Sequence, residues 1–367
     1  MSNPLVRLGK LGQSPWYDFI TRDLIRSGTL RRLIEQDGLL GMTSNPTIFE
    51  KAIAGSADYD ADIRALTANG LTPAAIFESL AIADVQAACD AFLPVYHAAA
   101  GRDGHVSLEV SPTLANDTLG TITEARRLWA SLGRPNAMIK IPGTQAGLPA
   151  ITECIAAGIN VNVTLLFAVG RYEAVIDAYF AGLEARTAKN LPIDGIASVA
   201  SFFVSRVDSR VDAFLDQKSA DGALRGTTAI ANAAMAYAAF QRAIATPRWA
   251  ALAAKGAQRQ RPLWASTSTK DPRLPDTYYV EALVARDTVN TLPPETYNAY
   301  RDHGDPAVRI DQAMAAAPAQ VAAVTALGID LADVTEFLED DGVAKFAASY
   351  RSLLAGIESK MGTLAGR

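Results

Sequence analysis

The sequence predicts an α/β fold in which eight parallel strands close into a (β/α)8 barrel, a TIM barrel, with additional helices. Segments with strand patterns alternate with helical segments along the 367 residues, and such alternation predicts a parallel sheet. Several strands pair an apolar face with a polar one, whereas strands of open parallel sheets are usually apolar throughout. A barrel explains both faces, because apolar side chains contact the outer helices and polar ones line the upper interior. An open doubly wound sheet is the alternative.

The expected strands are short apolar or alternating runs that end at turn residues. They cover residues 14–20, 39–43, 105–111, 137–141, 159–165, 196–204, 261–268 and 288–292. An N-terminal arm, residues 1–14, precedes the first of them. In the seventh, alternation places Trp264, Ser266 and Ser268 on one face.

The expected helices fill the intervals between these strands. They cover residues 22–36, 47–100 with a break near 70–73, 116–132, 144–158, 169–183, 206–260 with a break at Gly226, 276–285 and most of 295–367. The whole chain, 1–367, is therefore expected to form one barrel domain with extra C-terminal helices over about 295–367. The sequence leaves three places for those helices: the mouth of the barrel, its base, or an interface with another chain.

Composition excludes several classes of function. Hydrophobic residues make up 49% and charged residues 20% of the chain, which is typical of a globular protein with a large core. A net charge of -5 argues against nucleic-acid binding. The two cysteines lack zinc-site spacing, a structural disulfide is not expected, and no apolar run is long enough to span a bilayer. The cytoplasm is therefore the expected compartment, with neither nucleic acid nor membrane as a partner.

The segment 136–158, NAMIKIPGTQAGLPAITECIAAG, contains the first candidate catalytic residue. Alternation places Lys140 at the end of a strand, on the face opposite Ile139 and Ile141 and away from the helix that follows. A lysine among such side chains is desolvated, and desolvation favours the neutral amine that attacks a carbonyl group to form a Schiff base. The alternative is a strand-end lysine that extends its ammonium group to water.

Polar residues recur at the same position of many predicted strands, at or just beyond the C-terminal end. They are Asp18, Asn45, Glu109, Lys140, Thr164, Ser201 and Ser266. In a barrel these ends meet at one mouth, where active sites occur. Each residue has a structural alternative when taken alone: Asn45 as part of a turn, Asp18 as a helix cap, Ser201 as a packing residue. Their joint position predicts one polar pocket.

Five runs in this order resemble the transaldolase family, in its long bacterial form. They are TSNPT (43–47), SLEV (107–110), MIKIP (138–142), NVNVTLLF (160–167) and SFFVSRVD (201–208), and the segments LWASTS (263–268) and NTLPP (290–294) extend the match. The resemblance implies a cofactor-free Schiff-base transferase of the pentose phosphate pathway. Such an enzyme moves a dihydroxyacetone unit from sedoheptulose 7-phosphate to glyceraldehyde 3-phosphate, giving erythrose 4-phosphate and fructose 6-phosphate.

The resemblance also implies catalytic roles. Lys140 is the nucleophile. Glu109 is the general acid and base for dehydration of the carbinolamine, through a water held by Thr164. Asp18 takes the proton from the C4 hydroxyl of the donor as the C3–C4 bond breaks. No metal ligand is implied.

The same resemblance implies substrate-binding residues. Asn45 and Asn162 orient the bound three-carbon unit, and Ser201 contacts substrate hydroxyls. Arg206 and Ser266 bind the distal phosphate, for which the forked guanidinium is well suited.

One position departs from the family pattern. Some relatives carry a second phosphate-binding arginine two residues after the serine that matches Ser266, and this chain has Ser268 there. Lys270 is either the replacement cation or a solvated loop lysine.

Two other functions compete with transfer. One is a fructose-6-phosphate aldolase-like lyase, whose relatives are shorter and lack the glutamate that corresponds to Glu109. The other is a non-catalytic sugar-phosphate-binding barrel. Assembly into a homo-oligomer and fusion to another enzyme are both left open by the sequence.

Overall fold

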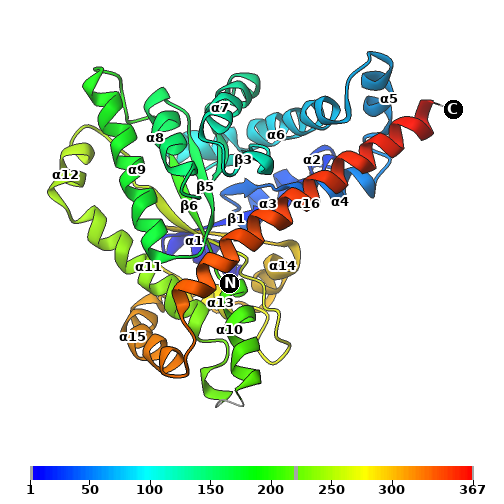
Figure 1. The fold of residues 1–367 in the computed structure, drawn as a ribbon. Coiled ribbons are helices and arrows are strands. Elements are labelled where there is room, and N and C mark those ends of the chain that lie inside the picture. The colour runs from blue at the N-terminus through cyan, green and yellow to red at the C-terminus, as the bar shows by residue number, and fades with distance from the viewer. Residues whose placement is uncertain (1–2, 219–221, 366–367) are drawn as a thin grey trace.

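The computed structural model describes residues 3–218 and 222–365, and it shows a barrel of parallel strands surrounded by helices (Figure 1). Within these residues eight strands lie in chain order around the barrel, and β1 pairs with β8 to close it. The strands are β1 (Gln13–Asp18), β2 (Gly41–Thr43), β3 (His105–Glu109), β4 (Ala137–Pro142), β5 (Val161–Leu166), β6 (Ser198–Phe203), β7 (Arg261–Ala265) and β8 (Thr288–Leu292). The predicted (β/α)8 barrel is confirmed, and the alternative prediction of an open doubly wound sheet is wrong.

The helices occupy the intervals that the sequence patterns indicate, with shorter pieces in the longer intervals. They are α1 (Pro4–Lys10), α2 (Arg22–Arg26), α3 (Thr29–Asp37), α4 (Pro46–Ala54), α5 (Asp60–Ala68), α6 (Pro73–Ala98), α7 (Thr118–Leu132), α8 (Gly147–Ala157), α9 (Val169–Ala188), α10 (Ser205–Gln217), α11 (Thr228–Ile244), α12 (Pro247–Ala253), α13 (Tyr278–Ala282), α14 (Pro294–His303), α15 (Ile310–Ala326) and α16 (Leu331–Ala365). Two short 3-10 turns, Pro112–Leu114 and Gly222–Leu224, complete them.

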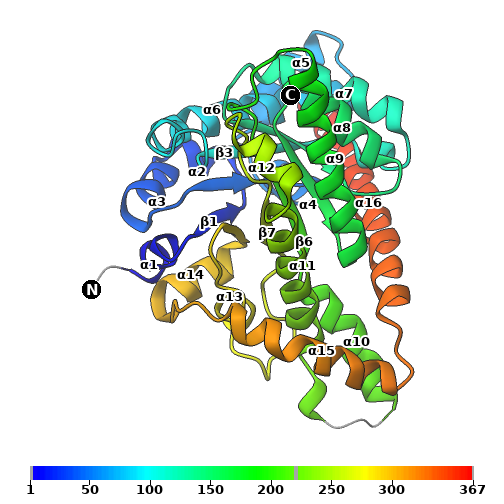
Figure 2. The same ribbon diagram turned by 90° about the vertical axis from the view of Figure 1, so that its left-hand side faces the viewer.

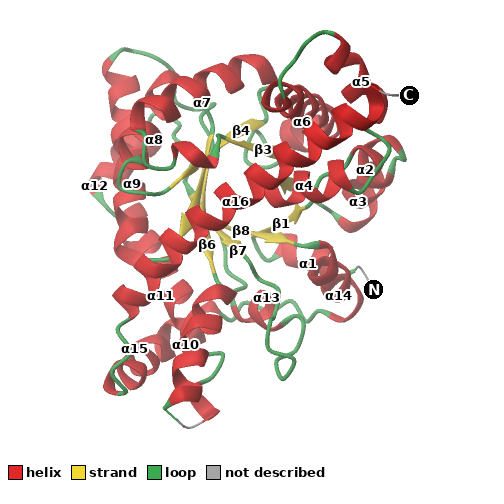
Figure 3. Ribbon diagram, turned by 45° about the vertical axis from the view of Figure 1, so that its right-hand side comes forward, coloured by secondary structure: helices red, strands yellow, loops and turns green. Residues whose placement is uncertain are grey.

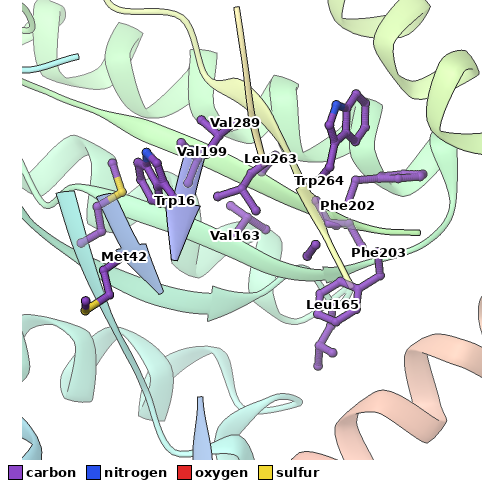
Figure 4. Close-up of a cluster of buried hydrophobic side chains, with 14 of the residues drawn as sticks. Trp16, Met42, Val163, Leu165, Val199, Phe202, Phe203, Leu263, Trp264 and Val289 are labelled. Carbon is purple, nitrogen blue, oxygen red and sulfur yellow. The ribbon is translucent and has the colours of Figure 1, made fainter. Parts of the chain in front are cut away.

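The core lies on both sides of the strands, because each strand is covered by outer helices and faces a filled interior. All residues of β4, β5 and β6 are buried, as expected for a parallel barrel. Figure 4 shows buried side chains from several strands, including Trp16, Val163 and Leu263. This packing holds the strand ends, and therefore the side chains at the mouth, in fixed positions.

The prediction that Trp264, Ser266 and Ser268 share one face of the seventh strand is wrong. Strand β7 ends at Ala265, and Ser266 has a positive φ of 56°, which interrupts the alternation. The indole nitrogen of Trp264 donates to the Leu283 carbonyl at 3.0 Å, whereas Ala265, Ser266 and Ser268 line a cavity at the mouth. Trp264 therefore does not share a face with the two serines.

The expected N-terminal arm contains a helix. In α1 the Asn3 side chain accepts the backbone N–H groups of Leu5 and Val6, and Pro4 occupies the first turn, which is a typical helix start. Leu5 and Leu8 are fully buried, and β1 already begins at Gln13. Residues 1–2 of the expected arm lie outside the described residues.

The helices after β8 take different positions, which the sequence had left open. Figure 2 shows α14 beside α1 and α15 beside α11, as their contacts confirm. Helix α16 runs diagonally across the barrel (Figures 1 and 3) and contacts α4, α5, α6, α10 and β5. The last helix therefore lies over the barrel strands; residues 366–367 are outside the described part of the chain.

Three expectations from composition can be compared with the described residues. Cys89 and Cys154 are buried free thiols. No helix in the described ranges is long and apolar enough to cross a membrane. These ranges also contain no group of three or more His, Cys, Asp or Glu residues suited to hold a metal ion.

Candidate active site

The mouth of the barrel contains a cavity of about 390 Å³. The predicted site residues that line it are Asp18, Asn45, Lys140, Ser201, Arg206 and Ser266. They come from β1, β4 and β6 and from the segments that follow β2, β6 and β7. The structure therefore brings together residues that lie up to 248 positions apart in the chain, at the end of the barrel where active sites form.

Lys140 lies on β4, opposite Glu109 of β3 and Asn162 of β5 in the strand registers. Its side chain is only 5% exposed, and Nζ donates to the Ser44 carbonyl at 3.2 Å. Nζ also lies 3.6 Å from Oε2 of Glu109. This Lys140 is therefore enclosed at the strand end, and the alternative of an ammonium extended into solvent is wrong.

Glu109 has an unusual environment for a carboxyl group. Its side chain is 3% exposed, and neither carboxyl oxygen has a hydrogen-bond partner among the described residues. Burial raises the pKa of Glu109 to about 7, although the nearby charge of Lys140 acts in the opposite direction. A carboxyl group with a pKa near neutrality can both donate and accept a proton under physiological conditions.

Asp18 occupies the end of β1, on the cavity wall. Its Oδ1 accepts a hydrogen bond of 2.6 Å from the Thr43 hydroxyl, which is also 2.6 Å from the Thr291 hydroxyl. Burial raises the pKa of Asp18, and the charge of Lys140 and the hydrogen bond from Thr43 oppose that shift. Asp18 does not cap α2, since Thr21 has that role.

Two other predicted residues form a hydrogen-bonded row inside the barrel. The Ser201 hydroxyl donates to Oδ1 of Asn162 at 2.7 Å, and Nδ2 of Asn162 donates to the Ser107 hydroxyl at 3.0 Å. Asn162 is fully buried beside Lys140 in the strand register, and it is not among the residues that line the cavity. These bonds hold the Asn162 amide in one orientation.

Thr164 is also buried, and it is not among the residues that line the cavity. It pairs with Pro142, two residues after Lys140. Its hydroxyl has no hydrogen-bond partner among the described residues, and a buried hydroxyl normally has one. Thr164 is therefore a suitable residue to bind a water molecule in the barrel.

Asn45 both caps a helix and lines the cavity. Its Oδ1 accepts the backbone N–H of Ile48 at 3.0 Å and thereby caps α4. The same side chain lines the cavity. The cap fixes the orientation of the amide, so Asn45 is placed by the start of α4 rather than by β2.

The cavity is also lined by cationic side chains, among them Arg206. Arg206 lies in the first turn of α10, where its guanidinium packs 5.1 Å from the Phe203 ring centroid. Burial lowers the pKa of Arg206, and Nη1 has no hydrogen-bond partner in the described chain. A buried guanidinium with a free donor is well suited to bind an oxyanion.

Ser266, Ser268 and Lys270 line the same cavity as Arg206. The Ser266 hydroxyl lies 3.0 Å from that of Ser205, and Nζ of Lys270 donates to the Ser268 hydroxyl at 2.7 Å. Lys270 is exposed, yet it is held at the cavity edge by this bond.

Several cavity residues had not been singled out from the sequence. They include Thr43, Lys51, Thr291, Glu295 and Phe346. The two threonines lie at strand ends, so the strand-end rule that found Asp18 also applies to them. Lys51 and Phe346 lie on helices whose position relative to the mouth is set by tertiary packing, and the sequence contains no local signal for it.

A buried lysine and glutamate pair at the mouth of a (β/α)8 barrel, beside a cavity that also contains an arginine, is an arrangement suited to carbonyl chemistry on an anionic substrate. Residues 15–357 match the family described as Transaldolase/Fructose-6-phosphate aldolase. The chain belongs to this family.

Full-length relatives agree with this assignment. The chain is 50% identical to "Transaldolase" of a Parafrankia species, with 100% of both chains covered. It is 51% identical to "Transaldolase" of Frankia alni, covering 99% of this chain and 98% of the relative. It is 48% identical to "Transaldolase 2" of a Nostoc species, covering 98% of each. These relatives support transaldolase activity for an enzyme with this site.

Proposed function

We propose that this protein is a transaldolase of the pentose phosphate pathway that works through a Schiff base on Lys140. It transfers a dihydroxyacetone unit from sedoheptulose 7-phosphate to glyceraldehyde 3-phosphate, and the products are erythrose 4-phosphate and fructose 6-phosphate. The observation that carries the proposal is the buried contact between Lys140 and Glu109, 3.6 Å apart, beside a cavity that also contains Asp18. The cytoplasm remains our prediction for the compartment.

The first half of the reaction forms the imine. The Lys140 amine attacks the C2 carbonyl of the ketose and gives a carbinolamine. Glu109 then supplies a proton to the departing hydroxyl, directly or through a water bound to Thr164, and water leaves. A carboxyl group whose pKa is about 7 is protonated often enough to act as this acid.

The second half breaks the carbon–carbon bond. Asp18 takes the proton from the C4 hydroxyl, the C3–C4 bond breaks, and its electron pair moves toward the iminium nitrogen to form an enamine. The aldehyde product leaves, and the enamine carbon then attacks the acceptor aldehyde. A buried carboxylate whose pKa is raised is a stronger base than a solvated one, which suits Asp18 for this proton.

Binding is divided between two groups of residues. Asn45, Asn162 and Ser201 orient the three-carbon unit near Lys140. Arg206 and Ser266 bind the distal phosphate, and Lys270, which lines the same cavity, supplies a second positive charge. The partners of this enzyme are accordingly sugar phosphates.

The matched family also includes fructose-6-phosphate aldolases, which are the second candidate function. Relatives named transaldolase across the full length favour transfer. The test supplies fructose 6-phosphate as donor and erythrose 4-phosphate as acceptor, and it follows the seven-carbon product by mass spectrometry. Formation of sedoheptulose 7-phosphate supports the proposal; free dihydroxyacetone with no seven-carbon product indicates the aldolase.

A further inference from the structure

The side of the cavity nearest α16 is formed by an aromatic ring. The centroid of the Phe346 ring lies 5.8 Å from Nζ of Lys140, and Phe346 lines the cavity that contains Asp18 and Arg206. Phe346 itself is only 5% exposed, so its other face is covered by protein. It comes from α16, the helix that runs across the barrel strands in Figures 1 and 3.

Helix α16 is attached to the barrel on both sides of Phe346. The polar attachments join Glu339 to Arg171 at 3.4 Å, Ser349 to Thr47 at 2.8 Å, and Lys360 to Asp60 at 2.7 Å. Between them, Gly342 lies so close to β5 that a Cβ atom there would be 2.9 Å from Cδ2 of Leu165. These contacts fix the height of Phe346 above Lys140.

We propose that Phe346 is a specificity-determining residue that favours transfer of the three-carbon unit over its release into water. This inference rests on the proposed Schiff-base reaction and adds a residue from the C-terminal helix to it. The ring excludes water from the side of the Lys140 adduct that faces α16.

The two outcomes differ only in what reacts with the enamine. In transfer, the enamine carbon C3 forms a bond with the acceptor aldehyde carbon, whose oxygen takes up a proton. In release, C3 takes a proton instead. Either step restores the iminium; in both routes water then adds to C2, the C2–N bond breaks, a proton is returned, and the ketose or free dihydroxyacetone leaves the Lys140 amine. The routes therefore separate at C3: water beside the enamine delivers the proton that commits it to release, and a group that keeps water from the adduct slows that step.

A phenylalanine suits this position because it has neither a donor nor an acceptor with which to hold water close to the adduct. This effect depends on the ring being held in place, which the attachments of α16 provide.

The test measures the ratio of released dihydroxyacetone to transferred product. Wild type, Phe346→Ala and Phe346→Gln are incubated with fructose 6-phosphate and erythrose 4-phosphate, and both products are quantified. The Gln variant keeps much of the side-chain volume and the helix propensity while making the wall polar. The control is Phe337→Ala on the same helix, whose ring packs 3.9 Å from the Arg210 guanidinium carbon and is 44% exposed.

We expect both Phe346 variants to raise this ratio on the order of tenfold, the change that about 1.4 kcal/mol produces. The KM for fructose 6-phosphate should stay near the wild-type value, and Phe337→Ala should leave the ratio unchanged. An unchanged ratio in folded Phe346 variants, or an equal rise in Phe337→Ala, overturns the inference. Failure of the wild type to transfer at all instead contradicts the proposed function.

Discussion

Oε2 of Glu109 lies 3.6 Å from Nζ of Lys140, and the two side chains are 3% and 5% exposed. In so dry an environment each charge depends on the other, because a buried ion without a partner is strongly disfavoured. Transfer of one proton from the ammonium to the carboxylate converts the ion pair into two neutral groups. The geometry thus couples the nucleophile to its acid, and this coupling underlies the first two predictions.

Lys140→Met should abolish transfer while leaving the fold intact, because the variant keeps an unbranched side chain but has no amine. We expect activity to fall about 10⁴-fold or more, and the far-ultraviolet circular dichroism spectrum to be retained. The matched control is Lys255→Met, which removes an exposed lysine. Near-normal transfer by Lys140→Met would refute the Schiff-base assignment.

Glu109→Gln should slow imine formation by about 10²- to 10⁴-fold, the usual contribution of a general acid. Because the pKa of Glu109 is raised to about 7, the wild-type rate of imine formation should fall as pH rises through that value and the acid form is lost. Single-turnover rates between pH 5.5 and 8.5 measure this. A Gln variant that keeps the same inflection near pH 7 would show that Glu109 does not cause it.

Arg206→Ala should raise the KM for fructose 6-phosphate about tenfold to a hundredfold, as expected for the loss of a charged hydrogen bond. Its effect on unphosphorylated dihydroxyacetone should be much smaller, because that molecule lacks the anion. Steady-state kinetics with both compounds measure the difference. Equal effects on the two would mean that Arg206 is not the phosphate-binding residue.

Lys270→Ala should also raise the KM for fructose 6-phosphate more than the KM for dihydroxyacetone. The increase should be smaller than in Arg206→Ala, because Lys270 is exposed and its charge is screened. The control is Lys345→Ala on α16, which removes an exposed lysine paired with Asp341. The contrast in KM between phosphorylated and unphosphorylated substrates is again the measurement. If both lysine variants behave alike, Lys270 is a solvated loop residue.

Asp208 on α10 gives a prediction about stability rather than catalysis. Burial raises its pKa from 3.8 to about 7, while the Ala229 N–H and the Tyr279 hydroxyl, which donate to it, oppose the shift. Between these pH values the unfolded chain has released a proton that the folded chain still holds. Rising pH from about 4 to about 7 therefore favours unfolding.

Asp208→Asn removes this pH-dependent loss of stability. The free energy of unfolding of the variant should therefore increase relative to that of the wild type as pH rises from about 4 to about 7. Urea unfolding of both proteins at several pH values measures the difference. Asp333→Asn, an exposed aspartate on α16, controls for the loss of one charge. A difference for Asp208→Asn that does not vary with pH contradicts the prediction.

The sequence predicted the barrel well because its strands carry strong local signals. The alternation in residues 159–165 and the Pro142-Gly143 stop identified strand ends, and with them Thr164 and Lys140. Glu109 was suggested only once several strand ends were considered together, and Arg206 only by the family resemblance. Their place at one mouth followed from barrel topology rather than from any local pattern.

Other features required the structure because they depend on distant contacts. Phe346 reaches the site through the crossing of α16, and its spacing resembles that of any buried helix residue. The positive φ of Ser266 interrupts the alternation that had grouped it with Trp264. The first helix had a local signal, Asn3 followed by Pro4, which would have identified it within the expected arm.

The most direct measurement is trapping with borohydride in the presence of fructose 6-phosphate, followed by peptide mass spectrometry. Reduction converts the Schiff base into a stable amine, so the modified residue reports where the covalent bond forms. We expect a reduced three-carbon adduct on Lys140, abolished in Lys140→Met. A folded enzyme that yields no adduct, or one modified at Lys51 or Lys270 instead, would contradict the central claim that Lys140 is the nucleophile.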